Sequence, residues 1–307
     1  MTEPRITPQT VAGRIADRSI SGTSLVVTVF GDSVSQHGGW IWLGSLIEAL
    51  EPFGLGERNV RTAVNRLAKQ DWLKVDRVGR RSYFCFTEEA QAHYERAARR
   101  IYSSRRKEWD GYWTLVLPVA VAERKREELI KSLSWQGFSS LAGGMYARPS
   151  AERAELDDTI AGLDLGGQVA VLQASAEDSQ SRSAIRELVR TKWKLDEIRD
   201  LYDEFLEFYR PLARDLDPDE LGPGQSFWLR TLMVHDYRRV LLRDPGFPDL
   251  VLPTGWFGFA AYELIKRTYK VLAPSSEQYI REALENAEGP MPPARRRFHR
   301  RFDGLDS

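Results

Sequence analysis

The 307-residue sequence contains a single cysteine, Cys85, so it cannot form an internal disulfide. Its four histidines, at positions 37, 93, 235 and 299, do not have the spacing of zinc ligands. No run of about eighteen apolar residues occurs, and the N-terminus, MTEPRITPQT, has neither the basic nor the apolar region of a signal peptide. We therefore expect a cytoplasmic protein that binds no metal and does not enter a membrane.

The chain also has no formal net charge, because its 44 Lys and Arg residues balance its 44 Asp and Glu residues. The balance is uneven along the chain. Residues 55–82 contain eight basic and three acidic residues, whereas residues 195–220 contain ten acids and three arginines. A local basic region in a neutral chain is typical of a nucleic-acid-binding surface, and the acidic stretch cannot lie on DNA.

An apolar content of 42% is sufficient for packed cores, and the length suggests about two or three domains.

The stretch from Trp40 to Thr87 predicts a winged helix-turn-helix. A short apolar strand, GGWIWL, is followed by a helix over 45–50, a Pro/Gly break, a second helix over 57–70 and a hairpin around 78–80. Cys85 lies in the alternating run SYFCF of that hairpin, which predicts a half-buried strand position and not a reactive thiol.

The second helix of this stretch has two distinct faces. Val60, Ala63, Val64 and Leu67 recur every three to four residues and should face the core. The second helix of a helix-turn-helix lies in the major groove, where Arg can bind guanine and Asn can bind adenine through two hydrogen bonds each. We therefore predict DNA contacts from the opposite stripe and from the hairpin tip, and the alternative is a basic face that is only solvated. The predicted DNA-binding residues are Arg58, Arg61, Thr62, Asn65, Arg66, Lys69, Arg80 and Arg81.

Two further helices complete this domain. Thr23 or Ser24 should cap a helix that carries Leu25, Val26, Val29 and Phe30 as its core positions. Thr87 should cap a helix that runs toward Arg106 and connects to the next domain. The basic second half of this connector either touches flanking DNA phosphates or is a solvated linker. Residues 1–107 thus form the expected winged-helix domain with its connector helix.

The remaining chain predicts two more domains. Strand-helix-strand followed by helix-strand over residues 108–182 is typical of a ferredoxin-like α+β domain. Residues 183–307 are mainly helical and should form an effector and dimerisation domain, beginning with one helix or a pair of helices over 183–210. The expected fold class is therefore a multidomain α+β protein.

The densest stretch of the C-terminal half runs from Ser226 to Leu272. Its first helix places aromatic, imidazole and guanidinium groups along one side, which suits an anionic ligand that carries phosphates. The alternative is that Arg238, Arg239 and Arg243 pair with the acidic stretch. The predicted effector-binding residues are Trp228, Arg230, His235, Arg238, Arg239 and Trp256.

At these residues the chain resembles the PaaX family of bacterial regulators of phenylacetic acid degradation, over most of its length. The resemblance is carried by VRTAVNRLAKQDWL, GRRSYF, WDGYW, FSSLAGGMYARP and, above all, LRTLMVHDYRRVLLRDP. One departure is Asp71, where the family usually has glycine, which affects the entry into the wing and not the fold. The resemblance implies a GntR-like winged helix, a middle domain similar to a small CRISPR-associated nuclease, a helical C-terminal domain, a homodimer, and repression relieved by phenylacetyl-CoA.

The leading hypothesis is therefore a dimeric repressor, without enzymatic activity or cofactor, that binds double-stranded operator DNA and is released by an acyl-CoA. One alternative is a metal-dependent nuclease that uses Asp110, but such an enzyme needs several carboxylates at one point and Asp110 has no acidic neighbour in its strand. The other alternative is an architectural DNA-binding protein without a ligand. It would leave the face of Trp228, His235 and Arg239 without a role.

Overall fold

The structure is a computed structural model that describes residues 13, 15, 20–103, 109–149, 153–217 and 220–305. The chain forms two compact units. Unit 1 comprises residues 1–104, 202–242 and 258–307, and unit 2 comprises residues 105–201 and 243–257. This grouping differs from the three consecutive domains expected from the sequence, because helices of the last third of the chain pack with the N-terminal elements. Within the described ranges, no helix is both long and apolar enough to span a bilayer.

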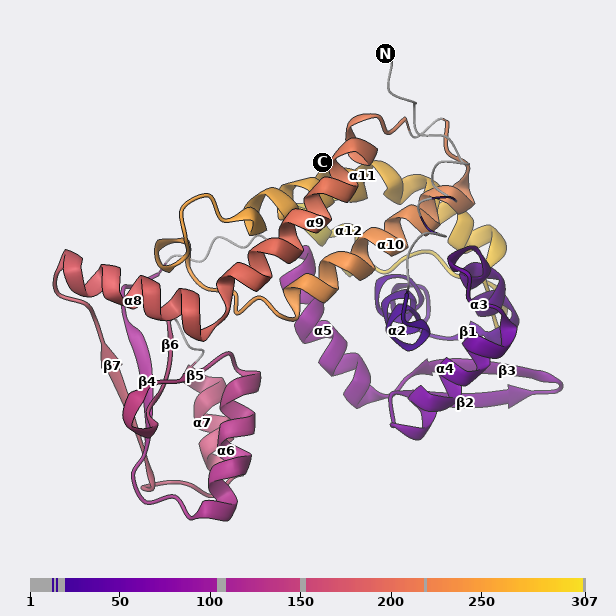
Figure 1. Ribbon diagram of the computed structural model, residues 1–307. Coiled ribbons are helices and arrows are strands. Elements are labelled where there is room, and N and C mark those ends of the chain that lie inside the picture. The colour runs from indigo at the N-terminus through magenta and orange to yellow at the C-terminus, as the bar shows by residue number, and fades with distance from the viewer. Residues whose placement is uncertain are drawn as a thin grey trace. The chain divides into compact units, whose positions relative to one another are not determined.

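Unit 2 contains the expected ferredoxin-like arrangement. Its four-stranded sheet is antiparallel with the order β5-β6-β4-β7, and helices α6 and α7 lie side by side on one face (Figure 1). Val116, Leu129, Leu133 and Leu156 are fully buried between the sheet and these helices. The elements are β4 (Trp113–Pro118), α6 (Glu123–Trp135), β5 (Ser139–Ser140), η3 (Ala142–Gly144), β6 (Tyr146–Pro149), α7 (Arg153–Gly162), β7 (Val169–Ala174), α8 (Ser179–Lys192) and η4 (Asp249–Val251).

The N-terminal part of unit 1 has the element order expected for residues 40–87. Strand β3 lies in the middle of an antiparallel sheet of order β1-β3-β2, and the helices over 45–50 and 57–70 are confirmed with small differences at their ends. The elements are α2 (Gly22–Asp32), η1 (Val34–Gln36), β1 (Ile41–Trp42), α3 (Leu43–Leu50), η2 (Glu51–Phe53), α4 (Glu57–Lys69), β2 (Leu73–Val78), β3 (Arg81–Phe86) and α5 (Glu88–Tyr102).

The predicted helix caps have different outcomes. Thr87 is the N-cap of α5, since its hydroxyl accepts a hydrogen bond from the backbone N–H of Ala90 at 3.1 Å. The prediction for Thr23 or Ser24 is wrong because α2 begins earlier, at Gly22, with Ser21 as N-cap. The Ser21 side chain makes no capping hydrogen bond, and the helix starts from its carbonyl, which accepts from the N–H of Leu25 at 2.9 Å.

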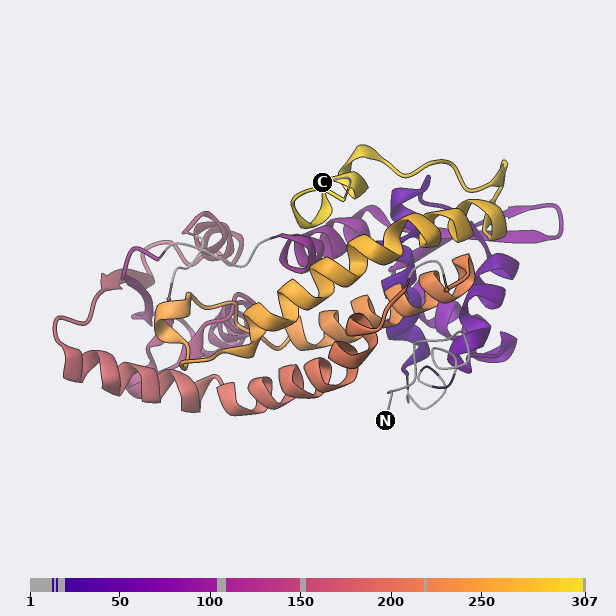
Figure 2. The same cartoon turned by 90° about the horizontal axis from the view of Figure 1, so that it is seen from above.

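Three long helices supply the C-terminal part of unit 1. Phe205 of α9 contacts Tyr237 of α10, and Phe227 of α10 stacks on Tyr279 of α11, so α10 lies between its two neighbours (Figures 1 and 2). The first residues of α9, up to Leu201, belong to unit 2. The elements are α9 (Leu195–Arg214), α10 (Pro223–Leu241), α11 (Phe257–Ala283), β8 (Glu285–Asn286), β9 (Gly289–Pro290), α12 (Arg296–His299) and η5 (Arg301–Asp303).

A buried cluster of charges joins these two parts of unit 1. The carboxylate of Asp32, at the end of α2, lies 3.2 Å from Nε of Arg230 and 2.9 Å from Nη1 of Arg301. The hydroxyls of Tyr102 and Tyr269 donate to the same carboxylate at 2.5 and 3.0 Å. Burial raises the pKa of Asp32, but the two arginines and two hydroxyls outweigh it and hold the pKa below its ordinary value. Asp32 therefore stabilises the fold in its ionised form, and this contribution is lost as the pH falls below 3.8.

The first prediction concerns this cluster. Replacing Arg230 by Met should lower the free energy of unfolding by about 3–5 kcal/mol, because the substitution removes a cation from two buried or half-buried carboxylates, Asp32 and Glu277. Arg239→Met is the matched control, since Arg239 lies on the same helix with 56% of its side chain exposed and should change stability by no more than about 0.5 kcal/mol. Urea unfolding measures both variants, and equal effects would show that the cluster does not hold the unit together.

Candidate nucleic-acid interface

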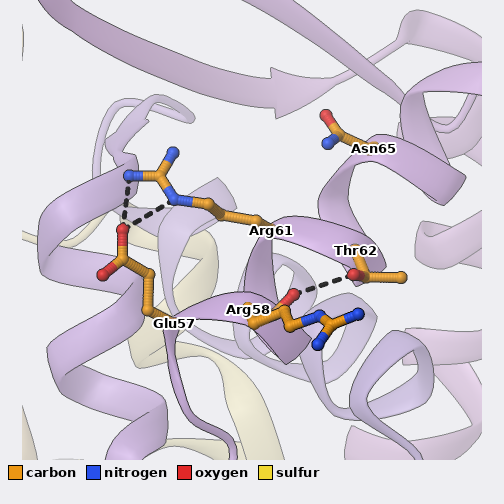
Figure 3. A pocket seen from close by; sticks show the side chains of 5 residues that line it. All are labelled: Glu57, Arg58, Arg61, Thr62 and Asn65. Atoms are coloured by element: carbon orange, nitrogen blue, oxygen red, sulfur yellow. Dashed lines mark hydrogen bonds and ion pairs between the residues drawn. The ribbon is translucent and has the colours of Figure 1, made fainter.

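Helix α4 has one buried and one exposed face, as its sequence predicts. Val60, Ala63, Val64 and Leu67 are buried in the unit 1 core. The side chains on the opposite stripe line a shallow groove with a volume of about 440 Å³ (Figure 3). The lining residues are Glu57, Arg58, Arg61, Thr62 and Asn65, and Arg66 and Lys69 are also exposed on this helix.

Two of the groove side chains already have partners within the helix (Figure 3). Nε and Nη2 of Arg61 lie 2.8 and 2.7 Å from the carboxylate of Glu57, one turn earlier. The hydroxyl of Thr62 donates to the carbonyl of Arg58 at 2.8 Å, so its oxygen remains only as an acceptor. Exposed pairs at this spacing contribute only about 0.3–0.5 kcal/mol, so an incoming base or phosphate can replace Glu57 on Arg61.

The turn after α4 has a geometry that suits the glycine expected at the position of Asp71 from the family resemblance. Asp71 has a φ of 56°, in the left-handed region that favours glycine. The N–H of Trp72 donates to the carbonyl of Leu67, and the N–H of Asp71 to that of Ala68, which is the Schellman pattern of a helix end. Thr87 also donates its hydroxyl to the Asp71 carbonyl at 2.7 Å. The departure at residue 71 is thus accommodated without a change of fold, since aspartate tolerates this conformation.

The hairpin of β2 and β3 turns at Gly79, which has a φ of 60°. Val78 pairs with Arg81, so Gly79 and Arg80 form the two-residue loop, and Arg80 is exposed at the tip. Arg81, which the sequence predicts to contact phosphates, already has partners in the structure. Its guanidinium donates to the carboxylate of Glu285 at 2.8 Å and stacks over the ring of Trp42 at 4.2 Å.

The predicted effector face on α10 is not one open surface. Arg230 is fully buried and bound to Asp32 and Glu277. His235 is 1% exposed, and its Nδ1 lies 3.1 Å from the hydroxyl of Thr28 on α2. Because that hydroxyl also has the Ser24 carbonyl as an acceptor, the imidazole acts as the donor to Thr28. Both side chains were expected to bind a ligand, and packing against the N-terminal elements gives them structural partners instead.

The other four residues of that face have varied positions. Arg238 is half-buried and donates to the Thr28 hydroxyl at 3.3 Å, and burial lowers its pKa. Arg239 is exposed, with a long 3.9 Å contact to Asp236. Trp228 packs edge-on against Tyr279 of α11, whereas Trp256 belongs to unit 2. The alternative expectation is that Arg238, Arg239 and Arg243 pair with the acidic stretch. The contacts in the structure differ for two of them, since Arg238 donates to α2 and Arg239 lies near Asp236 of its own helix.

The cysteine and the candidate metal ligand have ordinary structural surroundings. Cys85 is 7% exposed in β3, and burial raises the pKa of its thiol to about 11 despite the nearby Lys74. Asp110 accepts a hydrogen bond from the backbone N–H of Tyr112 at 2.9 Å, which places it in a turn. Among the described residues, no group of three His, Cys, Asp or Glu side chains could hold a metal ion.

Comparisons with known proteins agree across the chain. Three family models match: "PaaX-like protein" at residues 21–90, "PaaX protein central Cas2-like domain" at residues 106–186 and "PaaX-like protein C-terminal domain" at residues 193–282. The transcriptional repressor PaaX of Escherichia coli (strain K12) is 37% identical over 289 residues, which are 94% of this chain and 92% of that protein. The structure of the uncharacterized protein Rv0674 from Mycobacterium tuberculosis shares the fold, with a TM-score of 0.54, 22% identity and coverage of 84% of this chain and 97% of that one.

Proposed function

Because the chain belongs to the family of PaaX-like proteins, we propose that it is a cytoplasmic transcriptional repressor of a phenylacetate catabolic operon. It binds double-stranded operator DNA through a winged helix-turn-helix, in which α4 is the reading helix and the β2–β3 hairpin is the wing. The name of its E. coli relative supports the repressor role. The observation that carries the DNA contact is the exposed groove of α4, where basic and amide side chains lie opposite the buried apolar face.

The reading helix and the wing have different tasks in this proposal. Arg58, Arg61, Thr62 and Asn65 line the groove and are the candidates for base contacts, because guanidinium and amide groups recognise base edges. The exposed Arg66, Lys69, Arg80 and Arg81 lie outside that groove and are the candidates for phosphate contacts, which orient the protein without reading sequence.

The second prediction separates these tasks. Asn65→Ala should cost about 1–3 kcal/mol of discrimination at one base pair per half-site and leave binding to random DNA nearly unchanged. Arg80→Ala should weaken binding to operator and random duplexes alike and reduce the slope of log K against log salt by about one. Fluorescence anisotropy with both duplexes at several salt concentrations measures this, and identical behaviour of the two variants would refute the division.

The third prediction is that the protein acts as a homodimer joined through residues beyond 108. One reading helix and wing cover too few base pairs for operator-level affinity, so two copies should bind half-sites about 34 Å, or a multiple of this, apart. Light scattering should give twice the chain mass, and inserting half a helical turn between the half-sites should weaken binding strongly. A monomer at micromolar concentration that binds a full operator one-to-one would contradict the dimer.

The fourth prediction concerns the effector, an acyl-CoA such as phenylacetyl-CoA. It should raise the apparent free energy of unfolding by about 2.7 kcal/mol at a hundredfold excess over its dissociation constant, whereas free CoA should have a much smaller effect. Thermal-shift assays measure this, together with release of bound DNA.

The exposed Arg239 is the side chain of the predicted face that is most available to a phosphate. The variant Arg239→Ala should therefore still bind DNA but should no longer be released from it by the acyl-CoA. Normal release from this variant would exclude Arg239 from the site.

A further inference from the structure

The wing residue Arg81 is held by a segment from the other end of the chain. The C-terminal hairpin of β8 and β9 lies directly after α11 and places Glu285 beside β3 of unit 1. The Glu285 carboxylate accepts from Nη1 of Arg81 at 2.8 Å, and Trp42 lies under the guanidinium. About half of each charged side chain is exposed, at 50% for Arg81 and 40% for Glu285. The pair is therefore accessible to solvent and to a ligand.

The backbone of Glu285 is fixed more firmly than its side chain. Its N–H donates at 3.1 Å to the hydroxyl of Ser45, which is 1% exposed at the start of α3. Leu284 and Met291 on either side of the hairpin are almost fully buried, and the backbone N–H of Met291 donates to the Leu284 carbonyl. The Glu285 carboxylate therefore has a fixed backbone and lies within reach of Arg81, next to the basic tip of the β2–β3 hairpin.

We propose that Glu285 occupies the place of a DNA phosphate on Arg81, and that the C-terminal hairpin thereby weakens the grip of the wing on DNA. This inference rests on the proposed function, since it needs the β2–β3 hairpin to contact DNA. The Arg81–Glu285 pair as a whole has no net charge and attracts a phosphate less than a free guanidinium does, so DNA must displace Glu285 to gain the full contact with Arg81. The displaced carboxylate would then stand near the phosphate backbone and repel it. Both effects oppose binding, and neither depends on base sequence.

The β8–β9 hairpin follows α11 directly, so the position of α11 can regulate the contact between Glu285 and Arg81. Glu277, two turns before the end of α11, binds Arg230 and His37 at 3.1 and 2.7 Å. Helix α11 therefore contacts the buried cluster of unit 1, and the β8–β9 hairpin that directly follows it contacts the wing. A shift of α11 along the N-terminal elements would change the reach of Glu285 to Arg81, and with it the affinity for DNA.

The test uses substitutions in the full-length protein that each replace a glutamate by the uncharged glutamine. Glu285→Gln should increase affinity for a random duplex of roughly 30 base pairs by about three- to tenfold, and steepen the salt slope by about one, because one more cation becomes available to phosphate. Glu282→Gln is the matched control: it removes the same charge three residues earlier, from an exposed side chain that accepts from Gln278. It should change affinity less than twofold, as a distant exposed charge is screened by salt.

A double-mutant cycle identifies the partner. In the wild-type background Arg81→Ala should have little effect on affinity, whereas in the Glu285→Gln background it should cancel most of the gain. Unchanged or weaker binding by Glu285→Gln would overturn the inference while leaving the proposed function intact, provided that Arg80→Ala still weakens binding. A wild-type protein that binds no duplex would overturn both. A gain that is fully retained without Arg81 would show that Glu285 acts only through general repulsion and not by occupying Arg81, and the inference would also fail.

Discussion

The buried carboxylate of Asp32 determines how unit 1 is built. A charge that is buried away from water needs ion-pair or hydrogen-bond partners. The partners of Asp32 come from four other segments: Arg230 from α10, Arg301 from the C-terminal η5, Tyr102 from α5 and Tyr269 from α11. Removing α10, α11 or η5 would leave a buried charge uncompensated, and removing α5 would leave the carboxylate without one of its hydrogen bonds. The N-terminal elements and the C-terminal helices of unit 1 consequently form one cooperative unit, although nearly two hundred residues separate Ser33 from Arg230, its hydrogen-bond partner.

This arrangement gives α2 a role beyond supporting the reading helix. One side of α2 packs against α4, and another receives Arg230, His235 and Arg238 from α10. A ligand bound to the C-terminal helices has a short route to α4, because any change in the position of α10 acts on a helix that α4 touches. The size of the response is limited by the difference in the ligand's affinity for the two arrangements, and not by the number of contacts along the route.

Local patterns predicted the parts of the structure that local physics determines. The two faces of α4, the cap at Thr87 and the four-stranded sheet all follow from periodicity, capping chemistry and turn residues within a short window. The α10 face could not be read in this way. From Leu229 to Tyr237 every residue of that helix is buried, polar ones included, so polar side chains in its sequence do not distinguish a ligand site from a packing surface. The α2 partners of Arg230 and the Glu285 partner of Arg81 lie about two hundred residues away in the sequence, so no spacing pattern within a short window can predict these contacts.

The same limit applies to counts of charge. Eight basic residues between 55 and 82 predict a strongly positive surface, but Arg61 and Arg81 already bind carboxylates, one from the same helix and one from the C-terminal hairpin. Both pairs are exposed, so the carboxylates hold the guanidinium groups in place without excluding a competing anion. In the proposed DNA complex, binding would exchange carboxylate for phosphate at these two arginines and would add new ion pairs at the other basic residues. The free energy of this exchange depends on how firmly each carboxylate is held in place. The carboxylate on Arg81 belongs to Glu285, whose backbone is held by the C-terminal β8–β9 hairpin and by Ser45.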